Sequence, residues 1–139
     1  MEEQKKVFQL LVDNTAGVLS RISNLFSRRG YNIESITAGQ TADPKYTRIT
    51  IVTSGDDEIL EQIEKQVAKL VDVRDIKELE PDDSVYRELA LIKVRVSAEK
   101  RQDIIALADT DTFQGKIVDV HKEAMIIELT GNPRRIDNF

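Results

Sequence analysis

Residues 13–19, with the sequence Asp-Asn-Thr-Ala-Gly-Val-Leu, have the residue types and spacing to bind a small anion. They follow a short apolar run, residues 7–12, and open a helical pattern of apolar residues that continues to Phe26. A strand, a polar turn and an amphipathic helix in this order leave unpaired backbone N–H groups at the positive end of the helix dipole. The stretch is therefore a natural seat for a carboxylate or a phosphate.

The elements around this turn predict a ferredoxin-like domain. Apolar periodicity and turn residues predict, in order, a strand, a helix, two strands that form a hairpin, a helix and a strand. These elements span residues 7–12, 17–29, 31–38, 46–53, 58–70 and 71–79. Gly30 suits the C-terminal cap of the first helix, and residues 56–58 supply acidic N-terminal caps for the second. The β-α-β-β-α-β order predicts a four-stranded antiparallel sheet with two helices on one face.

The second predicted strand has an imperfect alternation. In a regular strand, Tyr31 and Ile33 would share one face, and Ile36 and Ala38 would share the other. A β-bulge or burial on both faces would explain this pattern.

The second half of the chain repeats the order in part, which makes the fold class α+β. Strands are expected at residues 88–96, 115–121 and 124–130, with a helix at 98–108. Gly131-Asn132-Pro133 looks like the start of another helix, and the chain reaches Phe139 before that helix and a last strand can form. We therefore expect an N-terminal domain over residues 1–79, a linker at 80–85 and an incomplete second ferredoxin-like domain at 86–139.

Composition indicates an ordinary cytoplasmic protein. The chain has 139 residues, a net charge of −5 and no cysteine, and 40% of its residues are hydrophobic. No signal peptide or membrane-length apolar run is present, and an acidic chain is a poor default partner for nucleic acid.

Other chemical candidates are weak. His121 is the single histidine, and residues 109–111 resemble a calcium loop without its glycine spacing or terminal glutamate. No Ser–His–Asp set, phosphate-binding loop or metal cluster can be assembled, so we expect no catalytic residues and no metal.

Four stretches together resemble a known family: residues 13–21, residues 25–36, residues 60–73 and residues 113–120. The first domain resembles an ACT domain, a module that senses small molecules. More narrowly, nearly the whole chain resembles the regulatory small subunits of acetolactate synthase, also called acetohydroxyacid synthase. The stretch at 109–112 is longer than this resemblance leads us to expect, and the second domain departs from the family pattern.

The resemblance implies a regulatory subunit without catalytic chemistry of its own. Its partner would be a catalytic subunit that holds thiamine diphosphate, magnesium and FAD. It would activate that subunit and confer feedback inhibition by a branched-chain amino acid, first of all valine. The amino acid would bind where two ACT domains meet in a homodimer. Carried over to this sequence, the site residues are Asn14, Ala16, Gly17, Val18 and Leu19 of one chain with Asn32 and Ile33 of the other.

The chemistry of these residues agrees with a zwitterionic ligand. Backbone N–H groups at Gly17 and Val18 would bind the carboxylate, Asn14 and Asn32 would bind the ammonium, and Leu19, with Val18 and Ile33, would contact the aliphatic side chain. From the residues alone, a turn or capping role is the commoner one for Asn14, and Asn32 is evenly balanced because asparagine is depleted in strands. The resemblance favours ligand binding for both.

Two alternatives stay open at this point. An ACT domain of this kind also fits an amino-acid sensor for another enzyme or regulator. The same β-α-β-β-α-β order also builds RNA-binding sheets, although those need aromatic residues on the central strands and a basic face.

Overall fold

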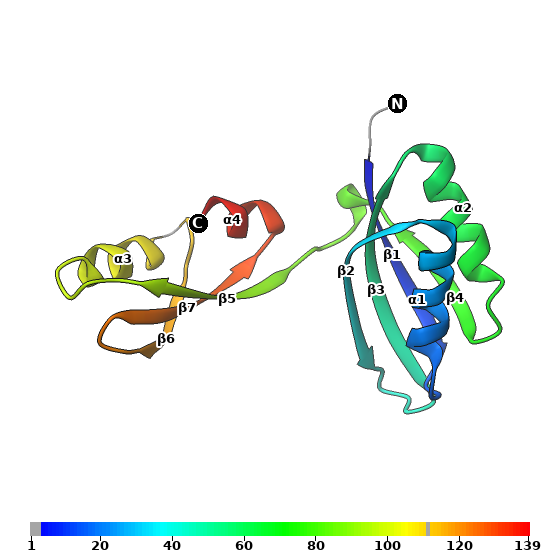
Figure 1. The fold of residues 1–139 in the computed structure, drawn as a ribbon, viewed down its shortest axis with the longest axis horizontal. Coiled ribbons are helices and arrows are strands. Elements are labelled where there is room, and N and C mark those ends of the chain that lie inside the picture. The colour runs from blue at the N-terminus through cyan, green and yellow to red at the C-terminus, as the bar shows by residue number, and fades with distance from the viewer. Residues whose placement is uncertain (1–3, 111) are drawn as a thin grey trace. The chain divides into compact units, whose positions relative to one another are not determined.

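The chain folds into two compact units, Met1–Asp83 and Ser84–Phe139, each with a core of its own (Figure 1). The computed structural model describes residues 4–110 and 112–139, so Asp111 of the weak calcium-loop candidate lies outside the described residues. The expected linker region contains a short 3-10 helix, η1 (Pro81–Asp83), and the units divide directly after it. Each unit is described by itself below.

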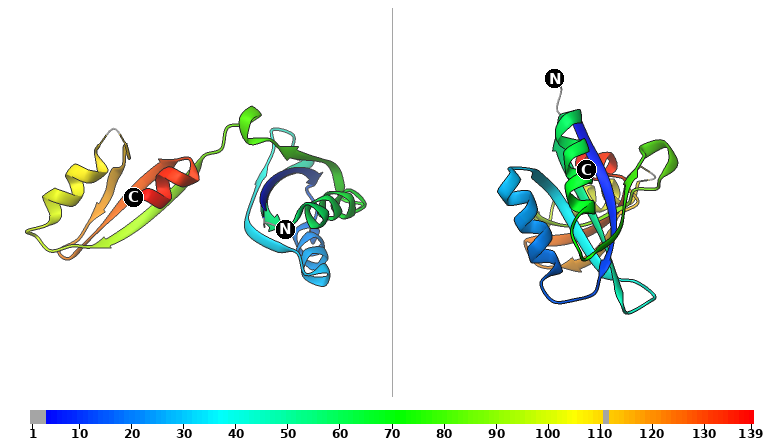
Figure 2. Two further views of the ribbon diagram at one scale, coloured as in Figure 1. Left: turned by 90° about the horizontal axis from the view of Figure 1, so that it is seen from above. Right: turned by 90° about the vertical axis from the view of Figure 1, so that its right-hand side faces the viewer.

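The first unit has the ferredoxin-like order and confirms the predicted fold class. Its elements are β1 (Gln4–Asp13), α1 (Val18–Arg29), β2 (Asn32–Gln40), β3 (Tyr46–Gly55), α2 (Asp57–Ala68) and β4 (Val73–Leu79). The strands form one antiparallel sheet in the order β2-β3-β1-β4, with both helices on one face (Figures 1 and 2). This order leaves β2 and β4 as the edges of the sheet.

The core of this unit lies between the sheet and the two helices. Alternate residues of β1 and β3 point into it, and α1 and α2 each contribute one apolar stripe. The buried side chains include Phe8, Leu10, Val12, Ile22, Phe26, Ile49, Ile51, Leu60 and Ile63. Each large aliphatic side chain buried in this way contributes roughly 1.5–3 kcal/mol to folding.

The helix ends follow the local sequence. Gly30 ends α1 in the left-handed conformation, with a φ of 69°, as expected for a C-terminal glycine cap. The side chain of Asp56 begins α2, because its carboxylate accepts a hydrogen bond from the backbone N–H of Ile59 at 2.9 Å.

The imperfect alternation of β2 is caused by a β-bulge, one of the two explanations that the sequence pattern left open. The pairing register of β2 with β3 shifts between Ile33 and Ser35. Ile33 lies opposite Thr53 and Ile36 lies opposite Ile51, and these two residues of β3 are both buried. The extra residue, Glu34, therefore brings Ile33 and Ile36 to the same face of the sheet.

The second unit has the order β-α-β-β-α. It contains β5 (Glu88–Arg95), α3 (Arg101–Ala108), β6 (Lys116–Val120), β7 (Ala124–Gly131) and α4 (Pro133–Asn138), with the sheet order β5-β7-β6. Its core is smaller and centres on β7, and its buried members are Val96, Ala108, Met125, Ile127 and Leu129.

Two boundaries in this unit need correction. We expected the chain to end before its last helix, but α4 forms, because Asn132 caps it and Pro133 has the backbone geometry of a first helical residue. We expected α3 to begin at residue 98, but residues 97–100 form a turn, in which the Lys100 N–H donates to the Ser97 carbonyl, and the helix begins at Arg101.

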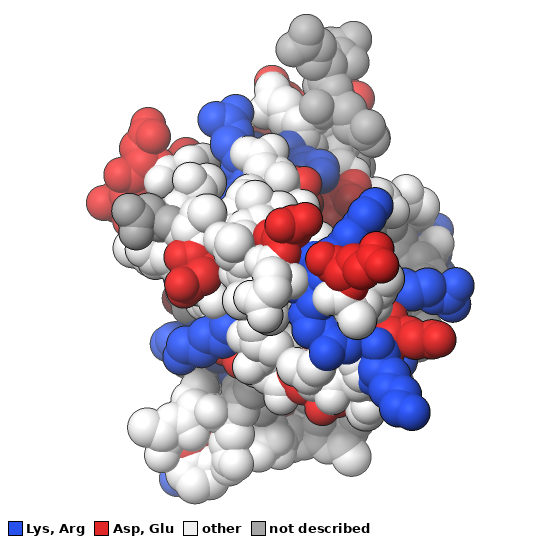
Figure 3. All heavy atoms as spheres, turned by 90° about the vertical axis from the view of Figure 1, so that its left-hand side faces the viewer, with Lys and Arg blue, Asp and Glu red and all other residues white. Residues whose placement is uncertain are grey.

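The surface carries charges of both signs. Figure 3 shows lysine and arginine side chains interspersed with aspartate and glutamate, without a broad basic patch on the face in view. Among the described residues, no helix is both long enough and apolar enough to cross a membrane.

Candidate functional site

A surface cavity of about 360 Å³ lies at the β1–α1 turn, the stretch with which the sequence argument began. The end of β1, the start of α1, the end of β2 and two residues of β3 form its walls. The lining residues are Val12, Asp13, Asn14, Thr15, Gly17, Val18, Leu19, Ser20, Ala38, Gly39, Gln40, Thr47 and Ile49. Small-molecule sites generally fall in the range of about 300–1,000 Å³, so the cavity suits a ligand the size of an amino acid.

The start of α1 gives this cavity its anion-binding character. The first i to i−4 hydrogen bond of the helix runs from the Arg21 N–H to the Gly17 carbonyl at 3.0 Å. The N–H groups of Leu19 and Ser20 precede that bond, at the positive end of the helix dipole. Both residues line the cavity, so a carboxylate there would meet backbone donors.

Gly17 is required by the backbone and by its neighbour. Its φ of 86° lies in the left-handed region, which other residues adopt at a cost. A Cβ at this position would lie 2.9 Å from Nη1 of Arg21. That guanidinium is held in place, because Arg21 forms an ion pair with Asp72 and donates to the Ala16 carbonyl at 3.4 Å.

Asn14 links two loops. Its Nδ2 donates to the Pro44 carbonyl at 2.9 Å, and its Oδ1 accepts from the Thr47 hydroxyl at 3.2 Å. Its backbone N–H donates to the Lys45 carbonyl at 2.8 Å. These bonds hold the β1–α1 turn against the β2–β3 loop, and the helix N-cap is Gly17 rather than Asn14.

Asp13 brings a fixed negative charge to the wall of the cavity. Its two carboxylate oxygens accept from Nε and Nη2 of Arg74 at 2.7 and 2.9 Å. The hydrogen bonds from Arg74 and its positive charge lower the pKa of Asp13 below the ordinary value of 3.8. Asp13 therefore stays ionised at neutral pH, and its charge is balanced by Arg74.

The apolar part of the cavity has a buried base and an exposed wall. Val12 and Ile49 are fully buried, and Val18 is 5% exposed. Leu19 is 48% exposed, which leaves its side chain free to cover an aliphatic ligand group.

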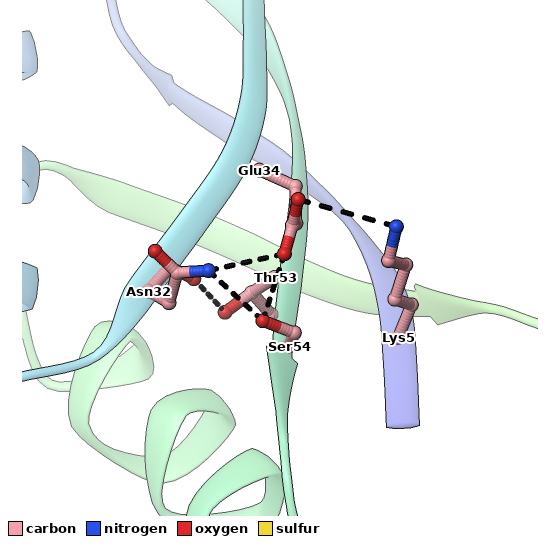
Figure 4. Close-up of polar contacts among 5 residues, drawn as sticks. All are labelled: Lys5, Asn32, Glu34, Thr53 and Ser54. Atoms are coloured by element: carbon pink, nitrogen blue, oxygen red, sulfur yellow. Dashed lines mark hydrogen bonds and ion pairs between the residues drawn. The ribbon is translucent and has the colours of Figure 1, made fainter. Parts of the chain in front are cut away.

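Within one chain, the two halves of the predicted site are apart. Asp13 pairs with Tyr46 at one end of β3, whereas Asn32 pairs with Ser54 at the other end. The structure thus brings Asn14, Gly17, Val18 and Leu19 together around the cavity, next to Ala16. It places Asn32 and Ile33 at the far end of the sheet, where Asn32 belongs to a separate polar cluster (Figure 4).

Strands β2 and β3 also contribute to the cavity, which the sequence pattern did not predict. Ala38, Gly39 and Gln40 line it from the end of β2, and Thr47 lines it from β3. The available signal was the predicted hairpin, since pairing strands 31–38 and 46–53 brings the end of the first beside the start of the second.

The weaker candidates from the sequence, His121 and a metal site, are not part of this cavity. His121 is exposed, and its Nε2 lies 2.8 Å from Oδ2 of Asp119. Over the described residues, no group of three metal-binding side chains comes together.

Comparison with known proteins agrees with this fold. Residues 8–75 match the family model "AHAS small subunit-like ACT domain", so the first unit is an ACT domain. Residues 87–139 match a second family model, "Small subunit of acetolactate synthase". The chain therefore belongs to the acetolactate synthase small-subunit family. Catalysis in this enzyme is carried by the large subunit, and the small subunit is regulatory.

Individual relatives support the assignment over nearly the whole chain. The chain is 45% identical to a probable acetolactate synthase small subunit of Methanothermobacter thermautotrophicus, over all of this chain and 82% of that protein. It is 49% identical to the acetolactate synthase small subunit of Mycolicibacterium smegmatis, over 92% of this chain and 74% of that protein. The crystal structure of the Thermotoga maritima small subunit superposes with a TM-score of 0.87 at 43% identity, covering 97% of this chain and 83% of that one.

Proposed function

We propose that this chain regulates an acetolactate synthase catalytic subunit by binding a branched-chain amino acid, valine first, between the first units of a homodimer. The observation that carries the proposal is the cavity at the start of α1, one wall of which is the end of the edge strand β2. An edge strand is where a second copy of the chain can add to the sheet.

The exposure of β2 supports pairing between two copies. Apart from Ile33, all residues of β2 are exposed, and Ile36 keeps 41% of its surface open to solvent. Antiparallel pairing of two β2 strands about a two-fold axis would cover this edge with the same surface of the second copy. The combined sheet would have no free edge at that position.

The same pairing would complete the predicted site. In an antiparallel pair, residues opposite each other have numbers with a constant sum. If the two-fold axis passes near Ile36, Asn32 and Ile33 of the second copy come beside Gln40 and Gly39, which line the cavity. The two halves that are apart in one chain would then meet.

The chemistry of the joined site fits a zwitterion with an aliphatic side chain. Backbone N–H groups at the start of α1 would bind the carboxylate, Asn32 of the second copy would bind the ammonium, and Leu19 with Val18 would contact the isopropyl group. Micromolar to millimolar affinity corresponds to roughly −8 to −4 kcal/mol. A few hydrogen bonds and one buried isopropyl group are sufficient for this.

Regulation then follows from a preference of the ligand for one dimer arrangement. If the catalytic subunit prefers a different arrangement, the two binding events oppose each other, with a coupling free energy that is typically about 1–3 kcal/mol. In this scheme the small subunit activates its partner in the absence of ligand and inhibits it in the presence of ligand. Thiamine diphosphate, magnesium and FAD would be held by the catalytic subunit, and the complex would work in the cytoplasm.

Isothermal titration calorimetry with valine, leucine and isoleucine tests the proposal. We expect saturable heat with at least one of them, and the amino acid that binds should inhibit the enzyme reconstituted with its catalytic subunit. A folded dimer that gives no binding heat with any of the three would refute the ligand assignment.

A matched pair of variants locates the site. Leu19→Ala should weaken valine binding roughly tenfold, because it removes apolar contact area from the ligand. Leu107→Ala is the control, since that leucine is 44% exposed, similar to Leu19, but lies on α3 in the second unit. Equal affinities for the two variants would place the amino acid elsewhere.

The RNA-binding alternative has little structural support. Of the two central strands, β3 has its aromatic residue, Tyr46, at its very start, where it pairs with Asp13. The aromatic residue of β1 is Phe8, which is only 1% exposed and packs in the core. It is therefore not available to stack on a base.

A further inference from the structure

The polar cluster at the start of β2 is built from side chains of three strands of the first unit. Its members are Lys5 of β1, Asn32 and Glu34 of β2, and Thr53 and Ser54 of β3 (Figure 4). Thr53 is fully buried, and Ser54 is only 6% exposed. The cluster therefore stands on a rigid base, although its outer members reach the solvent.

Hydrogen bonds in this cluster have a direction that is set by the carboxylate of Glu34. An ionised carboxylate accepts hydrogen bonds and cannot donate them. Oε1 of Glu34 lies 3.0 Å from Nδ2 of Asn32 and 3.0 Å from the hydroxyl of Ser54. Both groups must therefore donate to Glu34.

This direction fixes the amide of Asn32. Because the proton of the Ser54 hydroxyl is directed to Glu34, Ser54 is left as an acceptor for Asn32, whose Nδ2 lies 3.0 Å from Oγ of Ser54. The amide nitrogen of Asn32 is thus directed at Glu34 and Ser54, which lie side by side and 3.0 Å apart. The reverse orientation would place the amide oxygen against the carboxylate.

The backbone of Asn32 is held as well. Its carbonyl oxygen accepts a hydrogen bond from the Thr53 hydroxyl, and Asn32 pairs with Ser54 across the strands. Lys5 stands over the cluster, with its Nζ 4.0 Å from Oε2 of Glu34. The side-chain carbonyl oxygen of Asn32 is turned away from Glu34 and Ser54, as Figure 4 shows.

We propose that Glu34 and Ser54 are positioning residues, which hold Asn32 as a hydrogen-bond acceptor for the ammonium group of the bound amino acid. This inference rests on the proposed function. It assigns Asn32 the role of an acceptor, since its side-chain carbonyl oxygen can receive an ammonium group but not a carboxylate. It also makes the site select amino acids over carboxylic acids of the same shape that lack the ammonium group.

Glutamate variants test this role. We expect Glu34→Ala to raise the Kd for valine roughly tenfold, because a hydrogen bond to a charged group is typically worth that factor or more. Glu34→Gln keeps an oxygen that can accept from Asn32 and Ser54, so it should bind valine within about threefold of the unaltered chain. Glu78→Ala is the matched control, because Glu78 lies on the opposite edge strand and pairs with Lys6 at 3.1 Å.

Ligand analogues separate positioning from a general loss of structure. The same titrations with 2-hydroxy-3-methylbutanoate, in which a hydroxyl replaces the ammonium, should show a much smaller effect of Glu34→Ala. The preference for valine over this analogue should therefore shrink in Glu34→Ala and be restored in Glu34→Gln. An equal loss of affinity for both ligands, or no loss for either, would overturn the positioning role.

A measurement without ligand keeps this proposal distinct from the proposed function. In the dimer without ligand, the side-chain N–H resonances of Asn32 should exchange slowly with solvent, and Glu34→Ala should make them exchange faster. Slow exchange in a protein that binds no amino acid would support the fixed orientation of the Asn32 amide and refute only the assignment of an amino acid as its ligand. Fast exchange in the unaltered chain would refute the locked amide itself.

Discussion

Gly17 combines two constraints at one residue, a left-handed backbone and a close neighbour. The neighbour is the guanidinium of Arg21, which Asp72 holds in place. The position therefore couples the start of α1 to the residues just before β4. No other residue type satisfies both conditions without strain.

Three glycine variants separate these constraints by chemical denaturation. Gly17→Ala should lower the free energy of unfolding by about 1–3 kcal/mol, since the left-handed backbone and the contact with Arg21 both oppose a Cβ. Gly30 has a φ of 69°, and a Cβ added there would have no atom within 4 Å. Gly30→Ala should therefore show the cost of the left-handed backbone alone. Gly39→Ala has neither constraint and should change stability least. A Gly17→Ala variant as stable as Gly39→Ala would contradict this account.

The ion pair of Asp13 with Arg74 predicts an acid-sensitive contribution to stability. Because the pKa of Asp13 is lower in the folded chain than its ordinary value of 3.8, the contribution is present above that pH. This contribution to stability is lost as the pH falls through the lowered pKa that Asp13 has in the folded chain. Thermal melts should therefore show the Asp13→Asn variant less stable than the unaltered chain at pH 6, with the difference shrinking below about pH 4.

Arg74→Gln supplies the control for this pH dependence. In that background Asp13 has lost its partner, so Asp13→Asn should no longer produce a difference that depends on pH in this range. A difference that persists unchanged would mean that another group lowers the pKa of Asp13.

Among single residues, the sequence predicted the turn glycine Gly17 but not the side-chain contacts that surround it. A glycine after polar residues at the start of a helical pattern is a local signal. The bonds of Asn14 with Pro44 and Thr47 join residues 30 and 33 positions apart, which a local pattern does not specify. The cluster of Asn32, Glu34 and Ser54 was missed for the same reason, since it depends on the pairing of β2 with β3.

Among the elements, α2 has the best-defined start. Asp56 caps it, and Asp57 and Glu58 follow in its first turn, where negative charge is favourable. The helix packs Leu60, Ile63 and Val67 into the core of the first unit, so its stability is part of the stability of that unit.

The Asp56→Ala variant should lower the free energy of unfolding by about 1 kcal/mol, because it leaves the N–H of Ile59 without its acceptor. Asp56→Ser should recover most of that loss, since a serine hydroxyl can also cap a helix. Urea denaturation followed by circular dichroism measures both. An Asp56→Ser variant as unstable as Asp56→Ala would assign the effect to charge and not to the cap.

Element boundaries show what sequence patterns can and cannot predict. The strands and helices of the first unit were predicted to within a few residues, because their apolar periodicity is strong. Apolar spacing showed that β2 is irregular but left a bulge and burial on both faces as alternatives, and the pairing with β3 decides for the bulge. The start of α3 was wrong because Ala98 fits a helix as well as a turn, and the turn is decided by hydrogen bonds at Ser97 and Lys100. The start of α4 at Asn132 and Pro133 was recognised, but the residues up to Phe139 were expected to be too few for a helix, whereas six of them form one.

For the whole molecule, the central question is how two copies pair. The proposed homodimer depends on the free edge of β2, and Ile36 is the apolar residue exposed near its centre. Within the described residues of a single chain, the cavity has only one of its two predicted halves. Dimerisation and amino-acid binding should therefore be lost together.

Ile36→Lys tests this dependence. A lysine on an edge strand opposes pairing, because its charge would lie at the junction where the two β2 strands meet. In analytical ultracentrifugation the variant should shift from dimer to monomer, and calorimetry should show no valine binding. Ile59→Lys on α2 is the control, since Ile59 is 36% exposed and lies outside β2. A dimeric Ile36→Lys variant would move the interface to another surface.

The central position of β1 has a consequence for the order in which the chain folds. β1 lies between β3 and β4, and it pairs with residues 46–55 on one side and residues 73–79 on the other. During synthesis its apolar side chains have no strand partner until β3 has left the ribosome, and at about 5–20 residues per second that delay lasts seconds. The β2–β3 hairpin can form in microseconds once both strands are available, whereas the pairing of β1 with β4 must close a much longer loop. β1, the first strand to be synthesised, is thus exposed to aggregation the longest. The helix α1, which follows it in the chain, is the first element able to cover it.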